Sequence, residues 1–432
     1  MKLILKNIGM LEYAEVTLHP LCVIAGENDN GKSTVGKIVF CIIKAINRYK
    51  EDLLESKEHL ISDKSRDLYF LLRGALSQTS SDVDDIIKIL RPLSVRHAAL
   101  AEQLATIHAV TEKAIGLAEL DSQIKEKINR LCNEIDVIAH QPEDTRQSIE
   151  NAFNKVFASE FDASLLLHSQ QTGEIRLFEG DLELIHLRIE RTGNVSLLTD
   201  VEPVQIRDAT FIDTPLILNY HDVLARSQTL LDLDKRRPGR VGMAYTTLHT
   251  KDLFDKLREP ALPSNLLDTE RSSVLQNLQH VTNGEVTYAQ SEHDFVFRRN
   301  QIAFPIKNTA SGIKVFGLLQ ILLGNEIIAK NTMLIFDEPE NHLHPKWQLH
   351  LAQVLVSLAE QGVVILVSSH SPYMIEALKR FADRAGLSDS SRFFLADNQC
   401  IEDRDRLSDI FRILSEPFET FRNMDAEDLR DE

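Results

Sequence analysis

The sequence predicts an α/β fold that combines a mixed and parallel sheet with a helical insertion. Between about residues 301 and 384, short apolar stretches alternate with longer helical ones, which is the pattern of a parallel sheet. An apolar stretch at 21–25 precedes a turn that has a glycine at each end. The stretch 51–160 shows helical periodicity with few strand patterns. We therefore expect the sheet to draw strands from both ends of the chain.

We expect three segments along the chain. Residues 1–45 form the N-terminal part of the core, with a hairpin pattern, a buried strand at 21–25 and the start of a helix. Residues 46–160 form the helical insertion, and residues 161–432 complete the core. In this last segment, strand groups at about 173–213 and 285–307 precede the alternating region. An apolar stripe in the acidic C-terminal region predicts a docked terminal helix.

Apolar residues recur every seven positions in the insertion, which permits about three heptads of a helical hairpin or a short coiled coil. The repeat consists of Leu117, Ile124, Leu131 and Ile138, joined by Ile128 and Ile135 at the complementary position. A packed helical subdomain without a coiled coil remains the alternative.

The composition is that of an ordinary soluble globular protein, with 43% hydrophobic and 26% charged residues among 432. The four cysteines are far apart and form no C-x-x-C pair, which argues against a zinc knuckle or a disulfide framework and fits a reducing cytosol. The sequence has no signal-peptide pattern and no uninterrupted apolar run of about 18 residues. We therefore expect a cytoplasmic protein with no membrane partner.

The formal net charge of −17 argues against indiscriminate nucleic-acid binding, because such binding depends on clustered Lys and Arg. One stretch, 234–240, is locally basic. Its cations are Lys235, Arg236, Arg237 and Arg240. Both a solvated loop and a contact with nucleic acid or phosphate remain open for this stretch.

The stretch "GENDNGKS" at 26–33 fits the phosphate-loop pattern G-x-x-x-x-G-K-[ST] and lies between a predicted strand and a predicted helix. Gly26 and Gly31 permit the turns that aim backbone N–H groups at phosphate oxygens. Lys32 supplies a cation for the outer phosphates, and the Ser33 hydroxyl can bind Mg²⁺. The predicted nucleotide-binding residues of this segment are Gly26, Asn28, Asn30, Gly31, Lys32, Ser33 and Thr34.

Two further apolar strands end in chemically active side chains. In "MLIFDEPE", Asp337 at the strand end can hold Mg²⁺ through water, together with Ser33, and Glu338 can orient or deprotonate an attacking water. In "VILVSSHSP", His370 can hydrogen-bond a γ-phosphate and the same water. We therefore predict that Lys32, Glu338 and His370 are catalytic and that the cofactors are ATP and Mg²⁺.

A second turn of small residues lies at 308–320, "NTASGIKVFGLLQ", and opens onto an apolar helix. Such a turn can hold an anion on backbone N–H groups, which makes Ser311 and Gly312 further nucleotide-binding candidates. Ser311 precedes Asp337 by 26 residues, and His370 follows it by 33.

In this order and spacing the motifs resemble the ABC-type P-loop ATPase fold of chromosome- and repair-associated ATPases such as the SMC and RecF families. "ASGIK" and "ENHLHP" are most similar to the prokaryotic OLD group, which includes the ATPase subunits of Septu-type and retron-linked phage-defence systems. The resemblance covers the N-terminal 40 residues and about 301–377. It implies an ATP-hydrolysing enzyme that forms a homodimer or a higher homo-oligomer.

In that family, the residues that match Ser311 and Gly312 contact the nucleotide of a second protomer, and the stretch that matches 340–345 lies at the interface. The resemblance also implies control of a protein effector, a nuclease of antiphage defence, with the insertion and the acidic tail as candidate docking elements. The chain also departs from the family, and two of these departures concern candidate site residues. The glutamine that normally links the two lobes has only a weak counterpart, Gln205, and "IEDRD" at 401–405 is at best a fragment of a nuclease centre.

Two other functions remain open at this stage. A RecF-like repair or maintenance ATPase acting directly on DNA predicts a continuous basic surface around 234–240 and hydrolysis stimulated by DNA. A structural assembly protein that binds ATP without turning it over predicts an unchanged phenotype for Glu338→Gln. The intact Asp337–Glu338 pair argues against this last class.

Overall fold

The computed structural model places most of the chain in two compact units. The described residues are 1–75, 100–117, 121–140, 145–162, 164–229, 245–259 and 269–431. The first unit combines Met1–Asn47 with Ile149–Glu432, and the second is Arg48–Ser148. The second unit therefore ends earlier than the predicted insertion of 46–160.

Helix α6 (Thr145–Phe161) explains this difference. Asn154 exchanges hydrogen bonds with the backbone of Val195, and Glu150 accepts one from the N–H of Leu197, so the helix is bonded to a strand of the first unit. Its Phe153 and Phe157 are buried and stacked on each other. Helical periodicity alone could not separate α6 from the helices before it.

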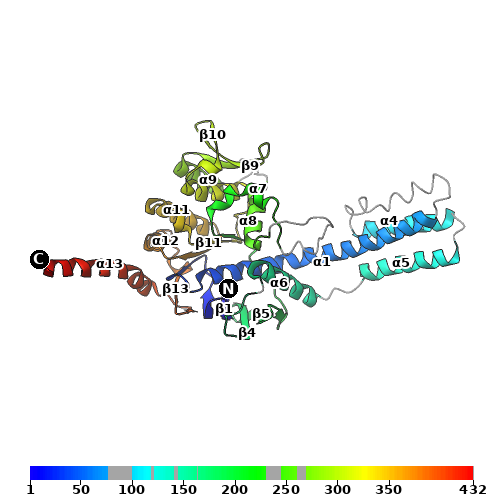
Figure 1. Cartoon of the computed structure of the whole chain (residues 1–432), viewed down its shortest axis with the longest axis horizontal. Coiled ribbons are helices and arrows are strands. Elements are labelled where there is room, and N and C mark those ends of the chain that lie inside the picture. Colours follow the sequence, from blue (N-terminus) through cyan, green and yellow to red (C-terminus); the bar gives the residue numbers. More distant parts are fainter. Residues whose placement is uncertain are drawn as a thin grey trace. The chain divides into compact units, whose positions relative to one another are not determined.

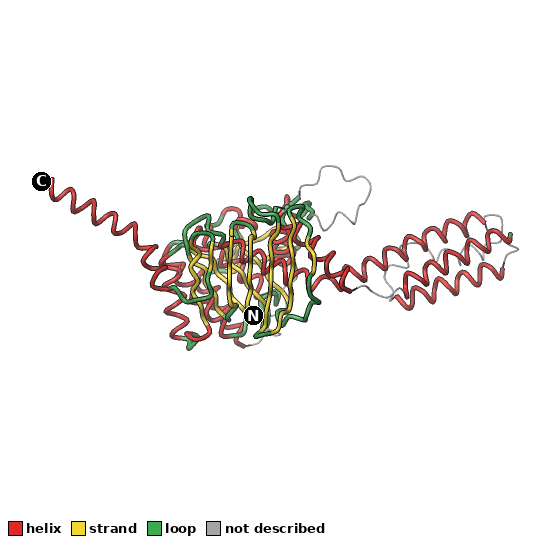
Figure 2. Tube along the Cα trace, turned by 90° about the horizontal axis from the view of Figure 1, so that it is seen from below, coloured by secondary structure: helices red, strands yellow, loops and turns green. Residues whose placement is uncertain are grey.

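The first unit is built on one large twisted sheet, whose strands run side by side in Figure 2. In the described residues it has eleven strands. Their order is β6 (Val195–Leu197), β5 (Leu182–Glu190), β4 (Thr172–Glu179), β1 (Lys2–Ile8), β2 (Leu11–Thr17), β14 (Cys400–Ile401), β13 (Ser391–Asp397), β3 (Leu21–Ala25), β12 (Val364–Ser369), β11 (Thr332–Asp337) and β7 (Asp208–Ile212).

The two halves of this sheet differ in strand direction. From β6 to β2 neighbouring strands are antiparallel, whereas β13, β3, β12, β11 and β7 are parallel to one another. The parallel strands are nearly continuous apolar runs, such as LCVIA in β3, because helices cover them. The predicted α/β fold with a mixed and parallel sheet is confirmed.

Helices α1 (Lys32–Ala75), α8 (Leu248–Arg258), α9 (Thr269–Thr282), α10 (Ser311–Gly324), α11 (Pro345–Glu360) and α12 (Pro372–Arg384) accompany this sheet (Figure 1). A three-stranded sheet of β8 (Glu285–Ala289), β9 (Asp294–Arg299) and β10 (Ile302–Pro305) packs against α10. Helix α10 is almost wholly buried, and its Phe316 lies in the same core as Phe295 and Phe336. The core therefore fixes the start of α10 relative to the end of β11.

The second unit has its own core, to which α1, α4 (Leu100–Leu117) and α5 (Ser122–His140) all contribute. Ile128 and Ile135 are fully buried, whereas the heptad residues Ile124, Leu131 and Ile138 are only partly buried and pack around them. A core shared by three helices corresponds to the packed helical subdomain rather than to a two-stranded coiled coil.

The start of β7 is held by a box of four charges. Asp208 and Asp252 each lie within 3.0 Å of both Lys44 and Lys256, so that α1 and α8 are tied to the first residue of the strand. Burial lowers the pKa of Lys44, but Asp252 and Asp208 outweigh this effect and raise the pKa overall. The box therefore ties α1 and α8 to the start of β7 through ion pairs.

The terminal helix α13 (Leu407–Asp431) is docked at its beginning. Ile410 is buried, and Ile413 and Leu414 pack against the core of the first unit. Phe421 and Met424 are 58% and 54% exposed, so the later part of the apolar stripe faces solvent. The prediction of a docked terminal helix therefore holds for the first turns of α13. No helix in the described part of the chain is long and apolar enough to cross a membrane.

Candidate functional site

The register of the parallel strands brings the predicted chemical groups to one edge of the sheet. Asp337 at the end of β11 pairs with Ser368 of β12, and Ser369 pairs with Ala25 of β3. The phosphate loop follows Ala25, and His370 follows Ser369. Because parallel strands end at the same edge, residues about 345 positions apart in the chain become neighbours.

The loop 26–31 is wrapped tightly enough that its two glycines are required. A Cβ atom at Gly26 (φ 150°) would lie 2.3 Å from the carbonyl oxygen of Ala396, and one at Gly31 (φ 77°) would lie 2.6 Å from Leu11. Lys32 is 4% exposed, and its Nζ donates a hydrogen bond to the carbonyl of Glu27 across the loop at 2.7 Å. The loop is thus preformed as a phosphate cradle.

Lys32 is buried near carboxylates. Burial lowers the pKa of its ammonium group, partly offset by Glu338 and Asp337. Its Nζ lies 3.8 Å from Glu338 Oε1. A cation held in this way can exchange its carbonyl and carboxylate partners for phosphate oxygens.

The residues predicted to hold a metal ion lie side by side. Ser33 Oγ donates a hydrogen bond to Asp337 Oδ1 at 2.9 Å, and Ser368 Oγ donates to the same oxygen. Hydroxyl and carboxylate oxygens at the start of a phosphate-loop helix fit Mg²⁺, a hard cation that prefers oxygen ligands. When bound, the ion would neutralise phosphate charge, and Ser33 and Asp337 would hold it.

Glu338 has a backbone conformation that L-amino acids seldom adopt, with φ 48° and ψ 55°. Its N–H donates to the carbonyl of Ser368 at 2.9 Å, and Asn341 Nδ2 donates to its Oε2 at 2.9 Å. Burial raises the pKa of Glu338, but the hydrogen bond from Asn341 and the charges of His370 and Lys32 outweigh it and lower the pKa overall. The carboxylate is therefore ionised and able to accept a proton from water.

His370 lies beside Glu338, with Nδ1 3.4 Å from Glu338 Oε1. In the described part of the structure this Nδ1 is buried, lies 3.5 Å from Glu340 Oε1 as well, and makes no hydrogen bond. The turn that carries it is fixed by Glu340, whose Oε1 accepts from Ser369 Oγ, His370 N and Ser371 N at 2.7, 2.7 and 3.1 Å.

The role of Glu340 was missed by the sequence reasoning, which placed it in an interface stretch. It is 6% exposed and turned inward, onto the backbone of the next strand. The available signal was its position in an acidic cluster just after a buried strand, where a carboxylate can bind the N–H groups of the neighbouring strand end.

Ser311 and Gly312 lie elsewhere. They start α10, whose N-cap Ala310 gives no side-chain hydrogen bond. Ser311 Oγ donates to the carbonyl of His342 at 3.1 Å, and a Cβ at Gly312 would lie 2.8 Å from the Trp347 ring. The contacts of the described residues therefore join this turn to the segment after Glu338 rather than to the phosphate loop.

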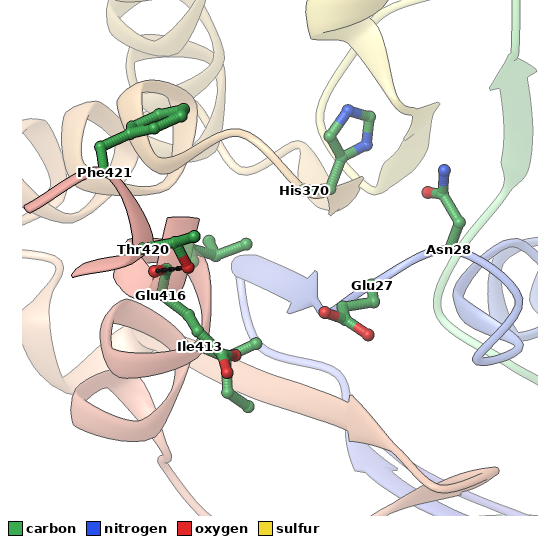
Figure 3. A pocket seen from close by; sticks show the side chains of 8 residues that line it. Glu27, Asn28, His370, Ile413, Glu416, Thr420 and Phe421 are labelled. Carbon is green, nitrogen blue, oxygen red and sulfur yellow. Dashed lines mark hydrogen bonds between the residues drawn. The ribbon is translucent and has the colours of Figure 1, made fainter. Parts of the chain in front are cut away.

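The phosphate loop, His370 and the terminal helix line a common pocket of about 650 Å³. Figure 3 shows Glu27 and Asn28 on one side of it, and Ile413, Glu416 and Phe421 on α13 on the other. Asn30 and Thr34 belong to the same loop and helix start, and the N–H of Thr34 donates to the carbonyl of Gly31. Residues of α13 thus bound the pocket on the side opposite the phosphate loop.

Gln205 lies at the wrong edge of the sheet. It precedes β7, whose first residue is Asp208, whereas the other site residues follow the ends of their strands. The position after β7, level with the site, is occupied by Asp213. The basic stretch 234–240 lies outside the described residues.

Residues 249–375 match the family model of the AAA ATPase domain. The protein is a P-loop ATPase. No match was found among curated proteins.

Among solved structures, this ATPase is similar to an SMC head bound to the C-winged helix domain of ScpA (10% identity, TM-score 0.41, 95% of this chain and 98% of the other). It is also similar to the SMC head domain of Thermotoga maritima (11% identity, TM-score 0.36, 94% and 98%). A third similar structure is an ATP-binding cassette of an ABC transporter in its ADP conformation (11% identity, TM-score 0.34, 96% and 96%).

Proposed function

We propose that this ATPase is a switch that dimerises through MgATP and thereby controls a separate protein effector, a nuclease of prokaryotic antiphage defence. ATP binding joins two protomers, and hydrolysis releases them. The ATPase chemistry is supported by the geometry of the site, and the defence role by the resemblance of "ASGIK" and "ENHLHP" to the OLD group.

Within one protomer, Lys32, Ser33 and Asp337 hold MgATP in this proposal. Glu338 accepts a proton from the attacking water, and His370 contacts the γ-phosphate. The support is positional: these side chains follow three adjacent parallel strands and lie within hydrogen-bond or ion-pair distance of one another. A preformed set of this kind contributes to catalysis by positioning and electrostatics.

The observation that carries the dimer proposal is the separation of the two anion-binding turns. Ser311 and Gly312 contact His342 and Trp347, away from the loop 26–31. A second protomer related by two-fold symmetry would place its own Ser311 turn over the phosphate loop, and the same contact would occur twice. The γ-phosphate would then bridge the two surfaces, so its removal would favour separation.

The test is light scattering coupled to size exclusion, with and without MgATP. We expect Glu338→Gln to double in mass with MgATP because bound ATP persists, and Ser311→Arg in this background to remain monomeric because the side chain blocks the turn. Ser122→Arg is a matched control, since Ser122 is likewise the first residue of a helix, α5. It should dimerise normally.

A mass that does not respond to MgATP in Glu338→Gln would rule out the switch. Equal loss of dimer in Ser311→Arg and Ser122→Arg would rule out a specific contact at the Ser311 turn. Hydrolysis that DNA stimulates in the absence of any effector would favour the repair ATPase instead.

A further inference from the structure

The exposed residue Asn341 lies three positions after Glu338, on the short turn between β11 and α11. This turn is the 3₁₀ helix η5 (Pro339–His342), and Glu338 is its N-cap. The N–H of Asn341 donates to the carbonyl of Glu338 at 3.1 Å. Because a 3₁₀ helix has three residues per turn, side chains three positions apart lie on the same side of it. The backbone therefore brings the Asn341 side chain next to the Glu338 carboxylate.

The turn is held on both flanks of Asn341. On one side the buried Glu340 accepts three hydrogen bonds from the segment 369–371. On the other side Ser311 Oγ donates to the carbonyl of His342 at 3.1 Å. The backbone at Asn341 is thus fixed through its neighbours, which limits the positions that its side chain can reach.

The two oxygens of the Glu338 carboxylate have different partners. Oε2 accepts a hydrogen bond from Asn341 Nδ2 at 2.9 Å. Oε1 lies 3.8 Å from Lys32 Nζ and 3.4 Å from His370 Nδ1. An ionised carboxylate only accepts hydrogen bonds, so the asparagine presents its amide nitrogen here and not its oxygen. Asn341 therefore holds one oxygen, and the other faces the groups that we propose contact ATP.

We propose that Asn341 is a positioning residue that anchors Glu338 Oε2 and thereby makes Oε1 the oxygen that receives the proton of the attacking water. In this step an O–H bond of the water breaks and its proton passes to Oε1. The water oxygen forms a bond to the γ-phosphorus of ATP, while the bond from that phosphorus to the leaving oxygen of ADP breaks. The inference rests on the proposed role of Glu338 and adds the group that fixes the direction of its carboxylate.

An anchor of this kind matters because a carboxylate rotates easily about its last C–C bond, whose torsion has only broad minima. A hydrogen bond from the protein to one oxygen restricts that rotation. Hydrogen bonds to charged groups are the stronger ones, and losing one corresponds to about a tenfold to hundredfold change in a rate. A general base must be within reach of the proton that it removes, so the loss should affect the chemical step rather than ATP binding.

The test is a double-mutant cycle on the rate of ATP hydrolysis, measured in single turnovers with the full-length chain. We expect Asn341→Ala to lower the rate about tenfold to a hundredfold without changing the affinity for ATP. Asn341→Gln keeps an N–H donor and should lose less than tenfold. In a Glu338→Gln parent, Asn341→Ala should cause no further fall, because no proton acceptor remains to be positioned.

Asn325→Ala is the matched control. Asn325 Nδ2 donates a comparable hydrogen bond, to the carbonyl of Lys256 at 3.0 Å, and neither residue belongs to the proposed site. Thermal unfolding shows whether each variant is folded. The hydrolysis rate of folded Asn325→Ala should equal that of the wild type, whatever the change in its stability.

Asn341 also lies in the stretch 340–345, which the dimer proposal places at the interface, so mass is measured in parallel. Glu338→Gln should gain the same mass with MgATP whether or not it carries Asn341→Ala. A loss of dimer caused by Asn341→Ala would overturn the inference, because the residue would then act through the interface.

A wild-type rate in folded Asn341→Ala would also overturn the inference. The same holds for an equal fall on adding Asn341→Ala to the wild type and to Glu338→Gln, since the effect would then not pass through Glu338. A Glu338→Gln parent that gains no mass with MgATP would overturn the dimer switch alone, and the cycle of rates would still test Asn341.

Discussion

The two edges of the parallel strands carry similar charged groups with different consequences. At the amino edge, Lys44, Lys256, Asp208 and Asp252 pair with one another. At the carboxyl edge the polar groups have fewer charged partners: His370 Nδ1 makes no hydrogen bond in the described residues, and the Asp213 carboxylate contacts His249 through Oδ2. The comparison teaches that burial and charge do not by themselves mark a functional residue. A functional residue is marked instead by hydrogen-bonding capacity that is not used within the protein and that faces a pocket.

The largest expected effect is at the carboxyl edge. Glu338→Gln should lower kcat for ATP hydrolysis by about 10³-fold, or about 4 kcal/mol, because the amide cannot accept the proton of water. ATP binding and unfolding free energy should change little. Steady-state hydrolysis measures kcat, nucleotide titration measures ATP affinity, and denaturant titration measures the unfolding free energy. Activity within about threefold of the wild type would show that Glu338 is not the base.

The next effect concerns pH. Burial lowers the pKa of His249, but the hydrogen bonds to Asp213 and Glu160 outweigh it and raise the pKa to about 9. A raised pKa in the folded state stabilises the protein fully below the unfolded value of about 6.5, and this stabilisation is lost as pH rises through about 9.

We therefore expect the difference in unfolding free energy between the wild type and His249→Gln to shrink by about 3 kcal/mol between pH 6 and pH 10. Denaturant titrations in EDTA at several pH values measure it. A difference that stays constant with pH would show that His249 contributes only packing.

At the amino edge we expect a change in stability without a change in chemistry. Asp208→Asn removes one carboxylate from the box and leaves Lys44 and Lys256 with only Asp252. Because Asp208 is 32% exposed, the loss should be about 2 kcal/mol of unfolding free energy, below that of a fully buried pair. The kcat of the folded variant should equal that of the wild type. A large fall in kcat would show that the amino edge of the parallel strands also contributes to hydrolysis, contrary to the comparison above.

The smallest effect should come from Glu340→Gln. The variant keeps an acceptor oxygen for the turn but loses the charge that strengthens its three hydrogen bonds. His370 should be held less firmly, and kcat should fall about tenfold, or about 1.4 kcal/mol, while the affinity for ATP stays constant. Separate measurement of kcat and nucleotide affinity tests this. A loss of stability with unchanged kcat would assign Glu340 to the fold alone.

Those parts of the candidate site that consist of short sequence patterns could be located from the sequence. The phosphate loop and the strand ends at Asp337 and His370 follow short patterns whose residues are fixed by a turn or by a strand. Their meeting at one edge follows from the parallel sheet, which the alternation of strands and helices predicted.

The supporting residues could not be found in this way. His249 lies 89 residues from Glu160 and 36 from Asp213, and only packing of α6, β7 and α8 brings the three together. Gln205 was selected by its residue type alone, and the sequence did not show that it lies before the amino end of β7, away from the site. A search for buried carboxylates and histidines near each strand end would have narrowed the choice, since such groups require partners.

The backbone at Glu338 has a consequence for engineering. Its left-handed conformation favours glycine, and a side chain there costs roughly 1 kcal/mol. A redesign that optimised stability alone would replace this glutamate with glycine. Under the proposed mechanism, the resulting protein would have a higher unfolding free energy but no ATPase activity. The backbone strain therefore falls on the residue that we propose to activate water, which would confine a trade of stability for activity to one peptide unit.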